Sequence, residues 1–228
     1  MLLPTVRAGE HMVTLTDLGF SKNMIYETLV CTYNPDGVTA NAAPMGAVMQ
    51  NLEQISLTIY NSASTLKNLQ THKSATLNLT DNIELFFQTA LKDTPLPEEL
   101  FEKSPTVNAP QLKPANATIA LTIQDFNPLD SQRTKITGKI CQIDALKIYP
   151  QSYCRAKSAV LEAIIHATRI KTLYKNKKEQ AHLTKLVALI QNCNEVVNRS
   201  APNSPYTKLM SDLQKKIDTW SPKHEGLC

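Results

Sequence analysis

Residues 39–80 read TANAAPMGAVMQNLEQISLTIYNSASTLKNLQTHKSATLNLT, and this stretch decides the fold. It begins with a run of small residues that ends at Pro44 and Gly46. Over residues 54–60, apolar side chains alternate with Ser, Thr and Tyr, and this period of two predicts a half-buried strand. Residues 61–68 are rich in hydroxyl and amide side chains, which is typical of a loop. The stretch therefore predicts strands of a sheet joined through a polar loop.

The two halves of this stretch suit the two ends of one ligand. Small residues on a strand allow a flat ring to lie close to the backbone, because no side chain holds it away. Short hydroxyl and amide groups with one cation, Lys67, are the donors that a phosphate needs. A planar ring followed by a phosphate describes flavin mononucleotide (FMN). The alternative interpretation is an ordinary β-meander with a polar turn and no ligand.

Five blocks along the chain carry a resemblance to a known family. They are YETLV (26–30), DGVTANAAPMGAV (36–48), YNSASTLKNL (60–69), NLTDNIELF (78–86) and RAKSAVLEAIIHATR (155–169). In this order they closely resemble a family of FMN split-barrel proteins catalogued as domain of unknown function 447. NAAPMG and EAIIHATR are the specific pieces, and the match extends from about residue 26 to the last helix.

The resemblance implies an α+β fold, namely an FMN-binding split barrel with a C-terminal three-helix appendage. The family is similar in fold to flavin reductases and flavoredoxins, which are generally homodimers with the flavin at the subunit boundary. We therefore expect a barrel domain over residues 1–150 and a helical subdomain over residues 151–228. The resemblance implies no particular reaction.

Period and turn signals predict the individual elements. Strands are expected at 23–33, 38–49, 54–60, 75–79, 117–126 and 133–149, after a first strand or lead-in at 12–20. Helices are expected at 62–70, 155–175, 179–199 and 204–220, with a buried helical turn within 81–91. Ser64 or Thr65 is predicted to cap the helix at 62–70. The proline-rich residues 93–118 predict a long loop, which is typical of a lid or of disorder.

The candidate cofactor-binding residues form two groups. Pro44 cannot donate to a β-ladder, so we expect it at an edge, a bulge or an opening of the barrel, where the flavin would dock. The candidates at the ring end are Thr39, Asn41, Ala42, Ala43 and Met45. The candidates at the phosphate end are Ser62, Ser64, Thr65, Lys67 and Asn68, and Asn78 completes the cofactor-binding set. The alternatives are a bulge without a ligand and simple helix capping.

The helix predicted from residue 155 carries an ionisable face. Spacings of seven, four and three place Arg155, Glu162, His166 and Arg169 on one side. We predict a polar network near the flavin site that senses or donates protons, or that holds an anionic substrate group. The alternative is a structural network that joins the helix to the barrel or to another subunit. Glu162 and His166 lack a second His or Cys pair, so no metal site is expected. Cys154 stands where the family usually has Asn, so the resemblance implies no contact from that position.

Composition sets the broad class. The net charge of +4 is uneven, because residues 1–150 carry 11 basic and 14 acidic residues and residues 151–228 carry 13 and 6. A basic C-terminal third can attract nucleic acid, but its lysines are not interleaved with aromatics, so solvated helix faces are the preferred explanation. The five cysteines are scattered, which fits a reducing compartment. With no signal-peptide pattern and no membrane-spanning stretch, a cytoplasmic location is expected.

Three functional hypotheses follow. The first is a homodimeric FMN-binding oxidoreductase, similar to flavin reductases, that acts on a small-molecule redox substrate or donor. The second is a non-catalytic flavin-binding sensor or interaction module. The third is an RNA-associated protein that uses the basic third, although the sequence contains no RNA-reading motif.

Overall fold

The computed structural model describes residues 13–22, 24–92, 95–146, 155–173 and 180–220. Contacts divide the chain into two compact units. The first consists of Met1–Thr80 and Pro97–Ile148, and the second of Asp81–Leu96 and Tyr149–Cys228. Residues 81–96 therefore group with the helices, and the domain boundary expected at residue 150 stays a prediction.

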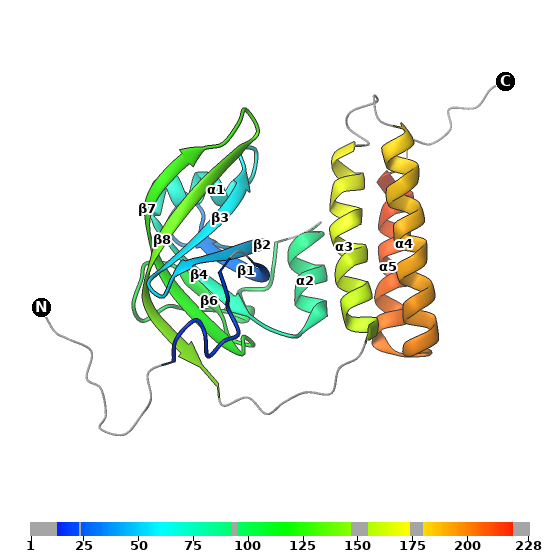
Figure 1. The fold of residues 1–228 in the computed structure, drawn as a ribbon, viewed down its shortest axis with the longest axis horizontal. Helices are drawn as coiled ribbons and strands as arrows, with labels where there is room; N and C mark the ends of the chain where they lie inside the picture. Colours follow the sequence, from blue (N-terminus) through cyan, green and yellow to red (C-terminus); the bar gives the residue numbers. More distant parts are fainter. Residues whose placement is uncertain (1–12, 23, 93–94, 147–154, 174–179, 221–228) are drawn as a thin grey trace, which may run out of the picture. The chain divides into compact units, whose positions relative to one another are not determined.

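Six antiparallel strands close into a barrel in the order β1-β2-β3-β8-β7-β4 (Figure 1). They are β1 (Ile25–Tyr33), β2 (Ala40–Asn51), β3 (Gln54–Tyr60), β4 (Ser74–Leu79), β7 (Ala117–Pro128) and β8 (Arg133–Ala145). Successive side chains of a strand point to opposite faces, so alternate apolar residues of these strands fill the barrel. All six predicted strands are confirmed, apart from residues 23 and 147–149, which lie outside the described part.

Two further segments contribute to the barrel core. Leu66 and Leu69 of α1 (Ser64–His72) belong to the same buried cluster as the inward strand residues. So do Leu15 and Phe20 of the lead-in. The described part of that lead-in forms a turn rather than the alternative first strand, and Thr14 and Asp17 hydrogen-bond across it. The apolar spacing that favoured a strand thus reflects two side chains anchored in the core.

The proline-rich segment is more ordered than predicted over its described residues 95–118. A short 3₁₀ turn (Glu98–Leu100) leads into a hairpin of β5 (Phe101–Lys103) and β6 (Pro110–Leu112). Two buried hydrogen bonds fix β6 to β4, because the Thr76 hydroxyl donates to the carbonyl oxygen of Pro110 (2.7 Å) and Leu112 N–H donates to Asn78 Oδ1 (2.9 Å). The expectation of a long loop is therefore wrong for these residues.

Asn78 is the side chain on which this arrangement depends. It is 0 % exposed, and its Nδ2 donates to the carbonyl oxygen of Leu29 (3.0 Å) on β1 and to Thr76 Oγ1 (3.0 Å) on β4. Its Oδ1 accepts from Leu112 N–H on β6 and, at 3.4 Å, from the Thr118 hydroxyl on β7. One buried amide therefore joins four strands, and each of its polar atoms has a partner.

The second unit is helical. It contains α2 (Ile83–Ala90), α3 (Arg155–Leu173), α4 (Gln180–Ser200) and α5 (Pro205–Trp220). Figure 1 shows α3, α4 and α5 running alongside one another. The three-helix appendage and the predicted helical turn within residues 81–91 are confirmed. None of the helices in the described residues has the length and apolar character needed to cross a membrane.

Several cations of this unit are engaged within it. The Lys157 ammonium pairs with Asp81 Oδ2 at 2.9 Å, and the Lys215 ammonium pairs with Asp212 Oδ1 at 3.0 Å. Lys171 lies over the Trp220 ring at 5.2 Å from its centroid, and the Lys216 ammonium lies 5.9 Å from the centroid of the Phe87 ring. These contacts tie α2 and α3 to neighbouring parts of the unit.

We predict that Asn78→Ala destabilises the barrel by roughly 2–4 kcal/mol, because buried donors and acceptors on four strands lose their partner. Urea unfolding measures the loss, and amide hydrogen exchange at Leu112 should accelerate. The control is Asn127→Ala at an exposed position of β7, which should change stability by less than about 0.5 kcal/mol. Equal stabilities for the two variants would contradict the role assigned to Asn78.

Candidate functional site

The strands β2 and β3 are paired along only part of β2. Residues 40–48 of β2 pair with β1, from Tyr33 opposite Ala40 to Ile25 opposite Val48. On the other side, pairing with β3 is found only from Ala47, opposite Leu57, onward. Among the described residues, β2 residues 40–46 and β3 residues 58–60 thus face a break in the ladder, which we call the β2–β3 split. Pro44 lies in it, so its predicted place at an edge of pairing is confirmed.

The split is bridged by the start of α1. Asn41 Nδ2 donates to the hydroxyl of Thr65 at 3.3 Å, which joins the small-residue part of β2 to the first turn of the helix. Thr65 is only 2 % exposed, so this contact is inside the fold. The structure therefore brings the small-residue strand and the hydroxyl-rich loop together, although they are some twenty residues apart in the sequence.

The first turn of α1 offers hydrogen-bond donors and contains no acidic residue. Its N-cap residue is Ala63, which makes no side-chain cap, and its first turn has no acidic residue. The predicted capping by Ser64 or Thr65 is therefore wrong, since both lie inside the helix. Ser62, Ser64 and Lys67 are exposed. Uncapped N–H groups, two exposed hydroxyls and a nearby ammonium form a donor set that suits a phosphate group.

Asn68, which the sequence placed at the phosphate end, forms hydrogen bonds that stabilise the fold. It is 1 % exposed, and its Nδ2 donates to Thr32 Oγ1 at 2.9 Å and to Asn34 Oδ1 at 3.0 Å. With His72, whose Nε2 lies 2.8 Å from the Asn34 carbonyl oxygen, it fixes α1 to the end of β1. The polar atoms of Asn78 are likewise used inside the barrel wall. The cofactor contacts predicted for these two amides stay predictions.

The ring-end candidates lie along β2 and the turn before it. Ala42 is fully buried, whereas Ala43 and Met45 are partly buried. Thr39 is exposed, and its hydroxyl donates to Asp36 in the β1–β2 turn. This hydrogen bond, with those from the backbone N–H groups of Val38 and Thr39, holds the pKa of Asp36 below its usual value. Thr39 thus stabilises the turn from which the small-residue strand starts.

Comparison with known proteins decides the family. The sequence model for the N-terminal domain of DUF447, described as a protein of unknown function, matches residues 26–146, more than half of the chain. The chain belongs to the DUF447 family.

Solved structures similar to this DUF447 chain include the FMN-bound protein MM1853 from Methanosarcina mazei, also assigned to DUF447. It is 22 % identical, with a TM-score of 0.73 over 89 % of this chain and 99 % of that one, which confirms the split-barrel fold. The 2-nitrobenzoate 2-nitroreductase NbaA of Pseudomonas fluorescens is 18 % identical, with a TM-score of 0.47 over 63 % and 77 % of the two chains. Nitrilotriacetate monooxygenase component B of Bacillus cereus is 17 % identical, with a TM-score of 0.48 over 69 % and 89 %.

The polar face of α3 in this DUF447 chain does not form the predicted hydrogen-bonded network within the described residues. Arg155, Glu162 and Arg169 are exposed, and His166 Nδ1 is buried without a hydrogen-bond partner. Burial of the ring lowers the pKa of His166; the charge of Glu162 opposes this shift and that of Arg169 adds to it. Burial, and secondarily Glu162, raises the pKa of the Cys193 thiol on α4. The predicted place of this face beside a flavin stays a prediction.

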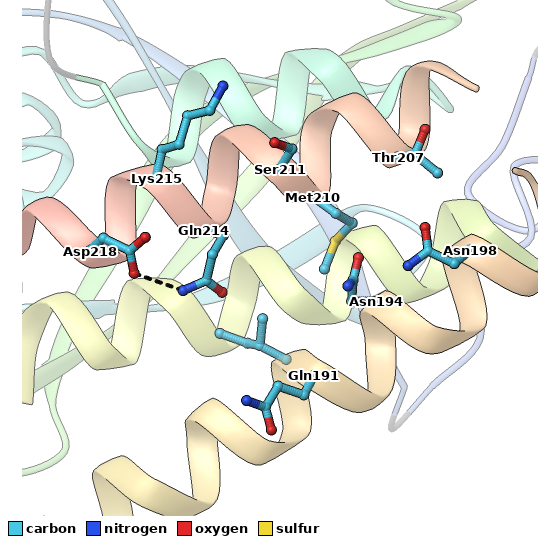
Figure 2. A pocket seen from close by; sticks show the side chains of 10 residues that line it. Gln191, Asn194, Asn198, Thr207, Met210, Ser211, Gln214, Lys215 and Asp218 are labelled. Carbon is cyan, nitrogen blue, oxygen red and sulfur yellow. Dashed lines mark hydrogen bonds between the residues drawn. The ribbon is translucent and has the colours of Figure 1, made fainter. Parts of the chain in front are cut away.

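A polar groove of about 430 Å³ lies between α4 and α5 (Figure 2). Ile190 and Met210 are its apolar residues, and Gln214 Nε2 donates to Asp218 Oδ1 at its edge (2.8 Å). The other lining residues are Gln191, Asn194, Asn198, Thr207, Ser211 and Lys215. None of its lining residues belongs to the predicted site. In the described part of the chain, no cluster of three His, Cys, Asp or Glu residues could hold a metal ion.

One polar cluster of the barrel wall is not apparent from the sequence. Gln50 Nε2 donates to the Ser56 hydroxyl at 2.9 Å, and the ammonium of Lys135 donates to Gln50 Oε1 at 3.4 Å. The only indication in the sequence was that these residues occupy polar positions in strands whose alternate residues are apolar. Their convergence could not be foreseen, because Gln50 and Lys135 are 85 residues apart.

We predict that an NMR titration gives His166 a pKa below its ordinary value of 6.5. The unfolded chain then binds more protons than the folded one between the two pKa values. The stabilisation from neutral His166 is therefore complete above about pH 6.5 and is lost as the pH falls through the folded pKa.

Replacing His166 by Gln should consequently weaken the pH dependence of unfolding below pH 6.5, as followed by the fluorescence of Trp220, the single tryptophan. His182→Gln, at an exposed site on α4, is the matched control and should leave the wild-type dependence in place. An unaltered pH profile for the His166 variant would contradict the assignment.

Proposed function

We propose that this chain binds FMN at the β2–β3 split and acts as a flavin-dependent oxidoreductase on a small-molecule redox substrate. The observation that carries the proposal is the hydrogen bond from Asn41 to Thr65, because it sets a strand of small residues beside an acid-free cluster of hydroxyl donors. The solved DUF447 protein MM1853, described as FMN-bound, supports the choice of cofactor.

The phosphate end of the site is assigned to the start of α1. Ser62 and Ser64 offer exposed hydroxyls, and the backbone N–H groups that follow Ala63 have no side-chain cap. Lys67 adds a cation in the next turn. A phosphate at a helix N-terminus is favoured both by the free N–H groups and by the helix dipole.

The ring end is assigned to β2. We assign Ala42, Ala43 and Met45, which are buried or partly buried, to the contact with the flat ring, and Asn41 supplies an amide beside them. Thr39 fixes the turn before this strand. When bound, FMN supplies the electron-transfer chemistry, and the chain provides binding, orientation and exclusion of water.

We further propose that the chain works as a homodimer, as the family resemblance implies. The ladder between β2 and β3 begins only at Ala47, and a strand that extends beyond its ladder favours association unless its edge is covered. Sedimentation equilibrium should give twice the mass of 25.3 kDa. A monomer at micromolar concentration would contradict this part of the proposal.

The proposed function is tested by a visible spectrum. We expect the purified protein to carry FMN, or to quench FMN fluorescence with saturable 1:1 binding when the cofactor is added. A preparation that binds no flavin would remove the proposal. Bleaching of the bound flavin by NADH or NADPH, followed by reoxidation with an acceptor, would support an oxidoreductase. Tight FMN binding without any turnover would instead favour a non-catalytic flavin-holding module.

The phosphate end is tested by the double variant Ser62→Ala/Ser64→Ala. Loss of two hydrogen bonds to a charged group should weaken FMN binding about tenfold or more. Binding of riboflavin, which lacks the phosphate, should change little. Ser131→Ala, at an exposed serine in the β7–β8 turn, is the control. If FMN and riboflavin lose affinity equally, the phosphate has been placed at the wrong end.

A further inference from the structure

Lys135 crosses one strand of the barrel wall to reach its partner. It belongs to β8, and β3 lies between β8 and β2 in the barrel. Its ammonium nevertheless donates to Gln50 Oε1 on β2, at 3.4 Å. Neighbouring strands are about 4.8 Å apart, so the lysine stem must lie across β3 to make this contact. The side chain is partly buried as a result.

Gln50 is directed to this place by an irregularity of β2. Met49 pairs with Ile55 and Asn51 with Gln54, so Gln50 is the extra residue of a β-bulge. Bulges re-aim a side chain and are frequent beside functional sites. Here the amide donates to the hydroxyl of Ser56, which is 4 % exposed, and accepts from Lys135. Ser56 lies between Ile55 and Leu57 of the barrel core, so this contact is on the outer face.

The charge of Lys135 has no acidic partner within the described residues. Two positions away on β8, the guanidinium of Arg133 is paired with Asp130 at 2.7 Å. Asp125 of β7 stands opposite Thr137 rather than opposite Lys135. A partly buried ammonium that is held only by a neutral amide retains most of its capacity to bind an anion.

Thr58 supplies a second donor at the same place. It is the direct cross-strand partner of Lys135 and is exposed. Side chains of such pairs have Cβ atoms about 5 Å apart, so a hydroxyl and an ammonium can reach the same anion. Thr58 also belongs to the β3 side of the split, and Ser62 lies only four positions further along the chain, a span of at most about 14 Å.

We propose that Lys135 and Thr58, with Gln50 as positioning residue, form an anion-binding subsite on the outer face of β3 and β8. The subsite takes a phosphate or carboxylate group. The group belongs either to the second substrate or to the cofactor itself. This inference rests on the proposed function for its place beside the flavin, but the binding of an anion by Lys135 can be measured independently.

The test compares Lys135→Gln with Lys135→Arg and with Lys139→Gln, an exposed lysine on the same strand. Inorganic phosphate and acetate are titrated by calorimetry into each protein, with and without added FMN. FMN and riboflavin are titrated separately by fluorescence quenching. Lys135→Gln should lose about tenfold in phosphate or acetate affinity, Lys135→Arg should retain most of it, and Lys139→Gln should match the wild type.

The two sources of the anion are distinguished by the flavin titrations. Weaker phosphate or acetate binding with unchanged FMN affinity assigns the subsite to a second substrate. Weaker FMN binding with unchanged riboflavin binding assigns it to the cofactor's own phosphate. Unchanged affinities in Lys135→Gln for FMN and for both anions would overturn the proposal.

Failure of the proposed function can be distinguished from failure of the anion-binding proposal. If the wild-type protein binds no flavin, the proposed function falls, and the phosphate and acetate titrations of the flavin-free protein still decide the role of Lys135. Gln50→Leu is the variant for the positioning role. It should weaken anion binding severalfold without abolishing it, because the ammonium remains but is no longer held.

Discussion

The site depends on one backbone constraint, the inability of Pro44 to donate to a β-ladder. A barrel closed along its full length would leave no place for a ligand beside the backbone of β2. At residues 40–46 this strand keeps its pairing with β1, whereas its ladder with β3 begins only at Ala47. The helix that follows β3 begins beside the break, with Leu66 and Leu69 in the barrel core and Thr65 bonded to Asn41. Loss of ladder pairing is thus offset by apolar burial and by one polar link.

Regular periodicity made most of the fold predictable. The barrel strands are at least six residues long, and the Asn-Pro-Asp-Gly turn fixes the first hairpin, with Gly37 at φ 75°. Three-residue strands such as β5 and β6 carry too little pattern to be recognised. Their position comes from Thr76 and Asn78, which are 34 residues from their partners on β6. Only the closed barrel brings those donors and acceptors together, so local sequence predicted a loop.

The candidate site was predictable in its outline and not in its detail. Residue types identified the small-residue strand and the hydroxyl loop, and the structure joins them. Asn68 was selected as a ligand-binding amide, yet its amide is used to hold α1 on β1. An amide has the same chemistry whether it binds a ligand or a neighbouring strand, so burial decides between the two roles. The same reasoning explains Gln50, whose direction is set by a bulge that no local pattern reveals.

The net charge of a region, like the identity of an amide, does not by itself reveal a binding role. The basic C-terminal third led to a nucleic-acid hypothesis, but Lys157 and Lys215 pair with carboxylates, and Lys171 and Lys216 lie over aromatic rings. Net charge counts these cations at full value, although their binding capacity is partly used within the helical unit. Lys135 contributes a single charge to a barrel sequence that is acidic overall, and it is held by an amide alone. Recognition of an anion depends on a cation that is held in position and has no acidic partner. The local arrangement around Lys135 is therefore more informative than the excess of positive charge elsewhere.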